Sequence, residues 1–206
     1  MTTSPATSPA EAGFAQFVLP GQRESGDRHI ISACDGFLLV AAIDGIGHGE
    51  EAAAAAEAAV TILRESVHHP IISAVELCHE RLRQTRGVVL SLASVDLRHG
   101  MITWLGVGNV QGVLLRAGTG RGTMREALLL RGGVVGSQLP PLQAAVLPFS
   151  PGDTLAFVTD GLRVSSLESL TALENPQRAA DRIIENYRTG QDDALALVVR
   201  IAKGGL

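Results

Sequence analysis

An unbroken apolar run that ends in an aspartate and a glycine-rich turn constrains this chain more than any other feature. Residues Phe37–Ile43 are all apolar, and the turn Asp44–Gly49 follows them directly. A run without polar alternation is typical of a β-strand that is buried on both faces. A carboxylate at the end of a buried strand is costly unless a positive charge meets it. The segment therefore predicts a core strand that carries Asp44 to a cation.

The same arrangement recurs twice, in the segments Leu155–Gly161 and Asp192–Val199. One Asp-Gly pair alone is usually a solvated turn, so the recurrence carries the argument. If the three strands are neighbours, Asp44, Asp160 and Asp192 converge on one rim. Hard divalent cations such as Mg²⁺ and Mn²⁺ prefer oxygen ligands of this kind, whereas Zn²⁺ favours cysteine and histidine.

Turn signals and apolar periodicity divide the rest of the chain into strands and helices. Strands are expected at Phe14–Leu19, Gly26–Ile31, Val88–Leu97, Met101–Val107, Val110–Arg116, Met124–Leu130, Ala144–Leu147, Thr154–Thr159 and Ala194–Ile201. Helices are expected at Glu50–Glu65, Pro70–Arg83, Ser165–Leu173 and Pro176–Tyr187.

This order of elements predicts an α+β fold. Two helices follow one another directly, which argues against simple alternation of strand and helix, and the strands between residues 88 and 130 resemble an antiparallel meander. We expect a flexible tail over residues 1–12 and a single domain over residues 13–206, with two antiparallel sheets packed together and helices outside.

Composition excludes several classes of function. The formal net charge is −4 and aromatic residues make up 3% of the chain, without a basic stripe, so no nucleic-acid partner is expected. No apolar stretch reaches membrane-spanning length and the N-terminus lacks a signal-peptide pattern, so we expect a cytoplasmic protein. Cys34 and Cys78 lack metal-motif spacing and are interpreted as small buried thiols. Four histidines are interpreted as surface residues: His68, His69, His79 and His99.

Seven short motifs resemble, in their order along the chain, the metal-dependent serine/threonine phosphatases of the PPM (type 2C) class. They are Ser25–Asp27, Asp44–Gly49, Thr85–Gly87, Val107–Val110, Val135–Ser137, Thr159–Leu162 and Asp192–Asp193. The resemblance is strongest to the short bacterial branch with SpoIIE and RsbU domains. It implies a four-layer αββα sandwich with two Mn²⁺ or Mg²⁺ ions between the sheets, and direct attack on phosphorus by a hydroxide that bridges them.

The resemblance also implies roles for single residues. Asp44 would bridge the two ions, Gly45 would supply a backbone carbonyl to one of them, and Asp160 and Asp192 would hold the other. Asp27 matches an acidic position near the metals, as a ligand or a holder of water. Asp193 is the alternative to Asp192, because alternation along a strand sends the two side chains to opposite faces.

Three further residues are candidates with weaker support. His48 is a candidate general acid for the leaving serine oxygen, although its offset from Asp44 differs from that in other phosphatases of the class. Arg23 is a candidate phosphate clamp because it lies just before Ser25–Asp27. Asn109 stands where some relatives carry an acid for a third ion, and an amide is a poorer ligand for a hard cation.

The partners implied by the resemblance are phosphorylated STAS-domain or anti-anti-sigma proteins of a stressosome pathway, dephosphorylated by a monomer. Two alternatives remain. One is a phosphatase-like binding module that has lost catalysis, which the complete set of carboxylates disfavours. The other is a nucleotide-binding domain, although the glycines at 45, 47 and 49 do not have the usual spacing and Glu50 would repel a pyrophosphate.

Overall fold

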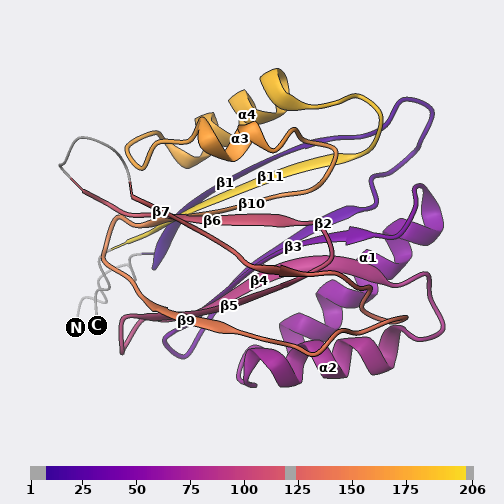
Figure 1. The fold of residues 1–206 in the computed structure, drawn as a ribbon, viewed down its shortest axis with the longest axis horizontal. Helices are drawn as coiled ribbons and strands as arrows, with labels where there is room; N and C mark the ends of the chain where they lie inside the picture. Colours follow the sequence, from indigo (N-terminus) through magenta and orange to yellow (C-terminus); the bar gives the residue numbers. More distant parts are fainter. Residues whose placement is uncertain (1–7, 119–123, 203–206) are drawn as a thin grey trace, which may run out of the picture.

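The structure is a computed structural model that describes residues 8–118 and 124–202 (Figure 1). Two β-sheets pack face to face, and each carries helices on its outer side, α1 and α2 on one and α3 and α4 on the other. The predicted α+β sandwich of four layers is therefore confirmed. Among the described residues, no helix is both long and apolar enough to cross a membrane.

The two sheets are built almost entirely from antiparallel pairs. The first has the strand order β1 (Ala10–Phe17), β11 (Ala194–Ile201), β10 (Thr154–Val158), β6 (Gln111–Leu115) and β7 (Arg125–Ala127). The second has the order β2 (Asp27–Cys34), β3 (Phe37–Gly45), β4 (Val88–Asp96), β5 (Met101–Val107) and β8 (Leu130–Arg131), with β9 (Ala145–Pro148) also paired to β5. Only the β5–β8 pair is parallel among the described strands.

This topology argues against a nucleotide-binding domain. β3 is followed by two helices and then by β4, which pairs with β3 in the antiparallel direction. A dinucleotide-binding fold requires parallel strands joined by single crossover helices. The glycine turn after β3 therefore lies in a different architecture.

The helices match their predicted spans, with one exception. α1 is Glu50–Glu65, α2 is Ile71–Leu82 and α4 is Pro176–Tyr187, whereas α3 spans only Ser165–Glu168 instead of continuing to Leu173. The guanidinium of Arg125 donates hydrogen bonds to the carbonyl oxygens of Leu167 and Leu170, at 2.7 and 2.6 Å. Those carbonyls are the ones that a longer helix would use for its own ladder, so the chain continues in turns.

Two strand predictions were wrong in instructive ways. The predicted meander does not stay in one sheet, because the chain crosses from β5 to β6 at Gly108, where φ is +95°. The predicted strand Met124–Leu130 is two strands, β7 and β8, that belong to different sheets. Local apolar pattern is the same in either sheet, so it could not reveal these crossings.

The first strand begins earlier than predicted. Ala10–Ala12, which we expected in the flexible tail, form the start of β1 and pair with the end of β11. Residues 1–7 of the predicted tail, residues 119–123 between β6 and β7, and the last four residues of the predicted domain lie outside the described residues.

The core explains how β3 positions Asp44. Leu39, Ala41 and Ile43 pack against α1 and α2, whereas Leu38, Val40 and Ala42 face the first sheet. Both faces of β3 are thus buried, as predicted. Side chains alternate along a strand, so Asp44 continues the row that points between the sheets.

Candidate metal centre

Two aspartates face one another across a pair of strands. Asp27 of β2 and Asp44 of β3 are directly opposed in the antiparallel ladder. Side chains in such pairs have Cβ atoms about 4.5–5.5 Å apart, and like charges there repel one another. Asp27 is 1% exposed and Asp44 is half-buried. The β2–β3 ladder therefore holds two carboxylates close together in a poorly solvated place.

A cleft of about 430 Å³ joins Asp44 to two of the other predicted carboxylates. Asp160, which follows β10, and Asp192, which precedes β11, both line this cleft. Asn109, in the crossing between the sheets, donates a hydrogen bond of 2.7 Å from Nδ2 to Asp160 Oδ2. Both sheets thus bring carboxylates to one opening, as the sequence predicted.

Close packing at two glycines fixes the backbone on either side of the cleft. A Cβ on Gly45 would lie 2.0 Å from the carbonyl oxygen of Ala52 in α1. A Cβ on Gly161 would lie 1.9 Å from the carbonyl oxygen of Asp193. Glycine is required at both positions because backbone lies where a side chain would be. Each Asp-Gly pair therefore places its aspartate by direct contact of the turn with a neighbouring segment.

The carboxylates raise one another's pKa. Burial is the largest cause for Asp44, and the charges of Asp27, Asp160, Asp192 and Asp193 add to it, which raises the Asp44 pKa to about 9. Burial also raises the pKa of Asp27 to about 8, although the hydrogen bond from Thr159 opposes the shift. The pKa of Asp160 is raised by burial and by Asp192. Proximity and poor solvation are thus the physical causes throughout.

Asp192 and Asp193 have different surroundings. Asp193 is 4% exposed and accepts hydrogen bonds from the backbone of Leu19 at 2.8 Å and of Gly26 at 2.7 Å. Its two carboxylate oxygens are therefore both engaged in holding the segment before β2. Asp192 lines the cleft and accepts a hydrogen bond only from the backbone of Asp193, among the described residues.

A threonine to which the sequence pattern assigned no role holds Asp27 in place. Thr159 is buried, donates a hydrogen bond of 2.8 Å from Oγ1 to Asp27 Oδ2, and accepts one from the backbone of Leu195. Thr159 directly follows β10 of one sheet, and Asp27 begins β2 of the other. The sequence indicated Thr159 only by its place directly before Asp160. No local pattern predicted that it contacts a residue of the other sheet.

The basic and histidine candidates do not line the cleft. His48 is exposed, is not among the residues that line the cleft, and has its Nδ1 3.2 Å from Gln22 Nε2. Arg23 is exposed and also lies outside the lining. Arg86, which the sequence indicated only as part of a motif, lies nearer: a Cβ on the cleft residue Gly47 would be 2.7 Å from its Nη1. Arg86 also forms an ion pair with Glu51 of α1.

The donor set fits hard divalent cations. Asp27, Asp44, Asp160 and Asp192 supply only carboxylate oxygens, and the described residues that line the cleft include no lysine or arginine to neutralise them. Oxygen-only sites of this kind suit Mg²⁺ or Mn²⁺ better than Zn²⁺. No sulfur or imidazole ligand lines the cleft in the part of the chain that the structure describes.

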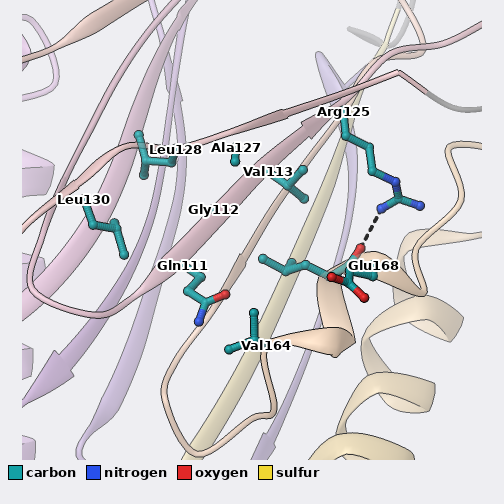
Figure 2. A pocket seen from close by; sticks show the side chains of 10 residues that line it. Gln111, Gly112, Val113, Arg125, Ala127, Leu128, Leu130, Val164 and Glu168 are labelled. Carbon is teal, nitrogen blue, oxygen red and sulfur yellow. Dashed lines mark hydrogen bonds between the residues drawn. The ribbon is translucent and has the colours of Figure 1, made fainter.

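A second, apolar groove has a volume of about 410 Å³ and shares no lining residue with the cleft. Three stretches of chain lead from a cleft residue to a groove residue within a few positions: Asn109 to Gln111, Gly132 to Leu130, and Asp160 to Val164. Figure 2 shows Gln111 and Val164 at one end of the groove and Arg125 at the other, where it bonds to the α3 segment. Val164 is 63% exposed although it is apolar.

Comparison with known proteins places the chain in a family. The family model of Stage II sporulation protein E (SpoIIE) matches residues 35–202. The chain belongs to the SpoIIE family. The resemblance to PPM phosphatases in the sequence is therefore confirmed, and the predicted class of enzyme, a metal-dependent serine/threonine phosphatase, is confirmed at the level of the family.

Individual relatives agree with this placement. The phosphoserine phosphatase RsbX of Bacillus subtilis (strain 168) is 21% identical over 179 residues, which cover 87% of this chain and 88% of RsbX. A structure from work on the bacterial stressosome, described as a system adapted to control secondary messenger signalling, is 30% identical, with 93% and 99% coverage and a TM-score of 0.82. The crystal structure of RsbX with magnesium is 20% identical and has a TM-score of 0.83, with 98% and 100% coverage. The sequence motifs also resembled RsbX in particular, and these matches confirm that resemblance.

Proposed function

We propose that this protein is a metal-dependent phosphatase that removes phosphate from serine or threonine residues of stress-signalling proteins. One observation carries the proposal: opposed strands and two turns bring four aspartates together, and no basic residue lines their cleft among the described residues. The relatives support it, because RsbX is a phosphoserine phosphatase and has been crystallised with magnesium.

In this proposal the aspartates hold two divalent cations, Mn²⁺ or Mg²⁺. Asp44, Asp160 and Asp192 would hold these ions, with Asp27 and the Gly45 carbonyl as further ligands. When bound, such ions polarise phosphoryl oxygens and make water a nucleophile near neutral pH. We assign the ligand role to Asp192 rather than Asp193 because both oxygens of Asp193 already accept backbone hydrogen bonds.

Neighbouring residues orient these ligands. Thr159 fixes one oxygen of Asp27, Asn109 fixes one oxygen of Asp160, and Asp193 fixes the backbone of Gly26 beside Asp27. Outer hydrogen bonds of this kind set the direction of a ligand's free oxygen. The cleft is thus arranged before any substrate arrives.

Further residues from outside the cleft lining complete the proposed site. We propose that Arg86, which lies against Gly47, binds the substrate phosphate, in addition to the sequence candidate Arg23. We propose His48 as the proton donor to the leaving serine oxygen. If it is, His48→Ala slows hydrolysis of a phosphoserine protein more than that of an aryl phosphate, whose leaving group needs no proton. Equal slowing of both reactions would remove His48 from this role.

Removal and replacement of metal test the proposed function. A chelator should abolish hydrolysis of a phosphoserine protein, and Mn²⁺ or Mg²⁺ should restore it better than Zn²⁺. Turnover that persists in chelator would exclude this mechanism. Binding of the phosphoprotein without turnover at any metal concentration would instead support a binding module that has lost catalysis.

The proposed substrates are phosphorylated STAS-domain or anti-anti-sigma proteins, and the stressosome relative supports this kind of partner. A monomeric state and a cytoplasmic location stay predictions. Purified phosphorylated STAS protein, incubated with the enzyme and Mn²⁺, should lose its phosphate much faster than an unrelated phosphoserine protein. Equal rates for the two substrates would contradict the assignment of partner.

The apolar groove is the proposed seat for the substrate chain beside the phosphoserine. Three stretches of chain lead from the cleft to the groove within a few residues, and a polypeptide whose phosphate enters the cleft must extend over a neighbouring surface. Val164→Glu should raise KM for the phosphoprotein about fivefold and leave hydrolysis of a small aryl phosphate unchanged. Leu173→Glu is the matched control, because Leu173 is also apolar and 91% exposed but lies outside the groove. Equal effects of both variants would contradict docking in the groove.

A further inference from the structure

A second group of potential metal ligands lies at the other end of β3. Cys34 ends β2, and Asp35 and Gly36 form the two-residue turn that leads to Phe37. The turn has φ angles of +46° at Asp35 and +82° at Gly36, which is the type I′ geometry of tight hairpins. Seven residue steps separate Phe37 from Asp44, which is about 23 Å at ~3.3 Å per step. This group is therefore separate from the carboxylate cleft.

The third member of the group comes from another part of the chain. His68 lies in the connection between α1 and α2, and its Nε2 is 3.4 Å from Cys34 Sγ. One donor atom each of Cys34, Asp35 and His68 lie within 4.8 Å of one another. A thiol, a carboxylate and an imidazole thus converge from a hairpin turn and a helix connection.

The spacing is close to that of a tetrahedral zinc site. Zn–S bonds of about 2.3 Å and Zn–N bonds of about 2.0–2.1 Å place sulfur and nitrogen about 3.5 Å apart. The observed separation of 3.4 Å between Sγ and Nε2 nearly equals this value. A small movement of the exposed Asp35 carboxylate would bring its oxygen to the same distance.

The backbone on both sides of the group is already fixed. Cys34 pairs with Phe37 at the end of the β2–β3 ladder. In the helix connection, Ser66 donates a hydrogen bond of 2.7 Å to the carbonyl of Ile62, and the backbone of His69 donates one of 2.9 Å to the carbonyl of Ser66. Val67, directly before His68, is buried at 8% exposure. Ligands held in this way lose little conformational entropy when a metal binds.

The Asp35 carboxylate is available for a ligand. Among the described residues it takes part in no side-chain hydrogen bond or ion pair. Arg98 packs across Gly36, with its Nε 2.6 Å from where a Cβ would lie, but it forms no ion pair with Asp35. A divalent cation bound to one thiolate and one carboxylate gives a neutral group, which the nearby guanidinium tolerates.

We propose that Cys34, Asp35 and His68 form a second metal site, for a thiophilic divalent cation such as Zn²⁺, that joins the β2–β3 turn to the α1–α2 connection. The mixed sulfur, nitrogen and oxygen ligands favour Zn²⁺ over the Mg²⁺ or Mn²⁺ of the cleft. Three protein ligands leave the fourth position to water. The two ends of β3 therefore select different metals.

Cobalt absorption tests this site independently of activity. The full chain, stripped of metal and then given excess Mg²⁺ to fill the cleft, is titrated with Co²⁺. We expect the near-ultraviolet charge-transfer band of a cobalt–thiolate bond, saturating at one equivalent and removed by Zn²⁺. Cys34→Ser should abolish the band, and Asp35→Asn and His68→Ala should weaken cobalt binding at least tenfold.

Three controls keep the outcome clear. Asn is well suited to a type I′ turn, so Asp35→Asn tests the ligand without disturbing the hairpin. Cys78→Ala removes the other cysteine, which is fully buried, and should leave the band unchanged. Asp44→Asn should also leave it unchanged, because Asp44 belongs to the cleft. Absence of the band, its survival in Cys34→Ser, or unchanged cobalt affinity in both Asp35→Asn and His68→Ala would overturn the proposal.

Discussion

Two regions of this protein hold poorly solvated aspartates, and they differ in whether a counter-charge is supplied. Asp153, at 1% exposure, accepts hydrogen bonds from Arg116 at 2.9 Å and from the backbone of Ala117 and Ser150 at 2.7 and 3.0 Å. Asp44 receives no side-chain hydrogen bond or ion pair among the described residues and faces Asp27, another carboxylate. The chain thus neutralises the buried Asp153 and leaves the half-buried Asp44 without a counter-charge among the described residues.

This difference between the Asp153 region and the Asp44 cleft indicates which of the two binds a cation. A buried carboxylate with a guanidinium and two backbone donors is complete, and it contributes to the fold. A group of carboxylates without such partners destabilises the fold unless an outside cation joins it. Among the described residues, the lack of a counter-charge distinguishes the cleft as the cation site. The presence of aspartate alone would not distinguish the two regions.

The largest expected effect is that of Asp44→Asn. Loss of the shared carboxylate should lower hydrolysis of a phosphoserine protein at least about 10³-fold. The same change removes repulsion, and one pKa unit corresponds to about 1.4 kcal/mol. The free energy of unfolding of the metal-free protein at pH 8 should therefore rise by at least about 1 kcal/mol, measured by urea denaturation. An Asp44→Asn variant that is less stable and still active would contradict the contrast between the cleft and the Asp153 region.

Asp192 and Asp193 allow the same contrast, between a metal ligand and a carboxylate that stabilises the fold, to be tested at two adjacent residues. Asp192→Asn should raise the Mn²⁺ concentration for half-maximal activity by about 10–100-fold, with little change in stability. Asp193→Asn should instead cost about 1–2 kcal/mol of stability, because one of two backbone donors loses its charged acceptor. Metal titrations and urea denaturation of both variants show which of the two aspartates is the metal ligand. If the two variants exchange these properties, Asp193 is the ligand.

Asp153→Asn tests the neutralised region. We expect a loss of about 2 kcal/mol of stability, since Arg116 is left with weaker partners, and no change in kcat of the folded enzyme. Glu126 also pairs with Arg116, which limits the loss. A change in metal dependence in this variant would show that the two regions are coupled, whereas we expect them to be independent.

The pH dependence of stability should also separate the regions. The raised pKa values of Asp27, about 8, and Asp44, about 9, mean that the folded metal-free protein holds protons that the unfolded chain releases near pH 4. The stability of the metal-free protein should therefore fall as pH rises from about 4 to about 9. Asp44→Asn should flatten this slope, and saturating Mg²⁺ should remove it. The difference between the natural chain and the variant isolates the cleft from His29, whose lowered pKa opposes the trend below pH 6.5.

Much of the fold could be predicted because its signals are local. The alanine-rich α1, the proline-started α4 and the apolar strands β3 and β11 carry their periodicity or burial in their own residues. The crossing at Gly108 and the division of the strand after residue 124 could not be predicted, because an apolar strand fits either sheet equally well. The early end of α3 depends on Arg125, which lies some 40 residues earlier in the chain.

The candidate site shows the same division. Recurrence of aspartate at strand ends, together with the family motifs, indicated Asp44, Asp160 and Asp192 from the sequence alone. The choice between Asp192 and Asp193 depended on the backbone of Leu19 and Gly26, and the role of Thr159 on a contact between sheets. Cys34 and His68, interpreted from the sequence as a buried thiol and a surface histidine, lie close together, with Cys34 half-buried and its Sγ against the imidazole. Contacts of this kind join distant residues and leave no local pattern.

Anomalous scattering from a crystal soaked in Mn²⁺ tests most directly whether the cleft is a metal centre. We expect manganese peaks in the cleft, in contact with Asp44, Asp160 and Asp192, and no peak beside Asp153 or Asp193. Manganese bound elsewhere, with the side chains of Asp27 and Asp44 sharing only a proton, would contradict the assignment of these aspartates as metal ligands.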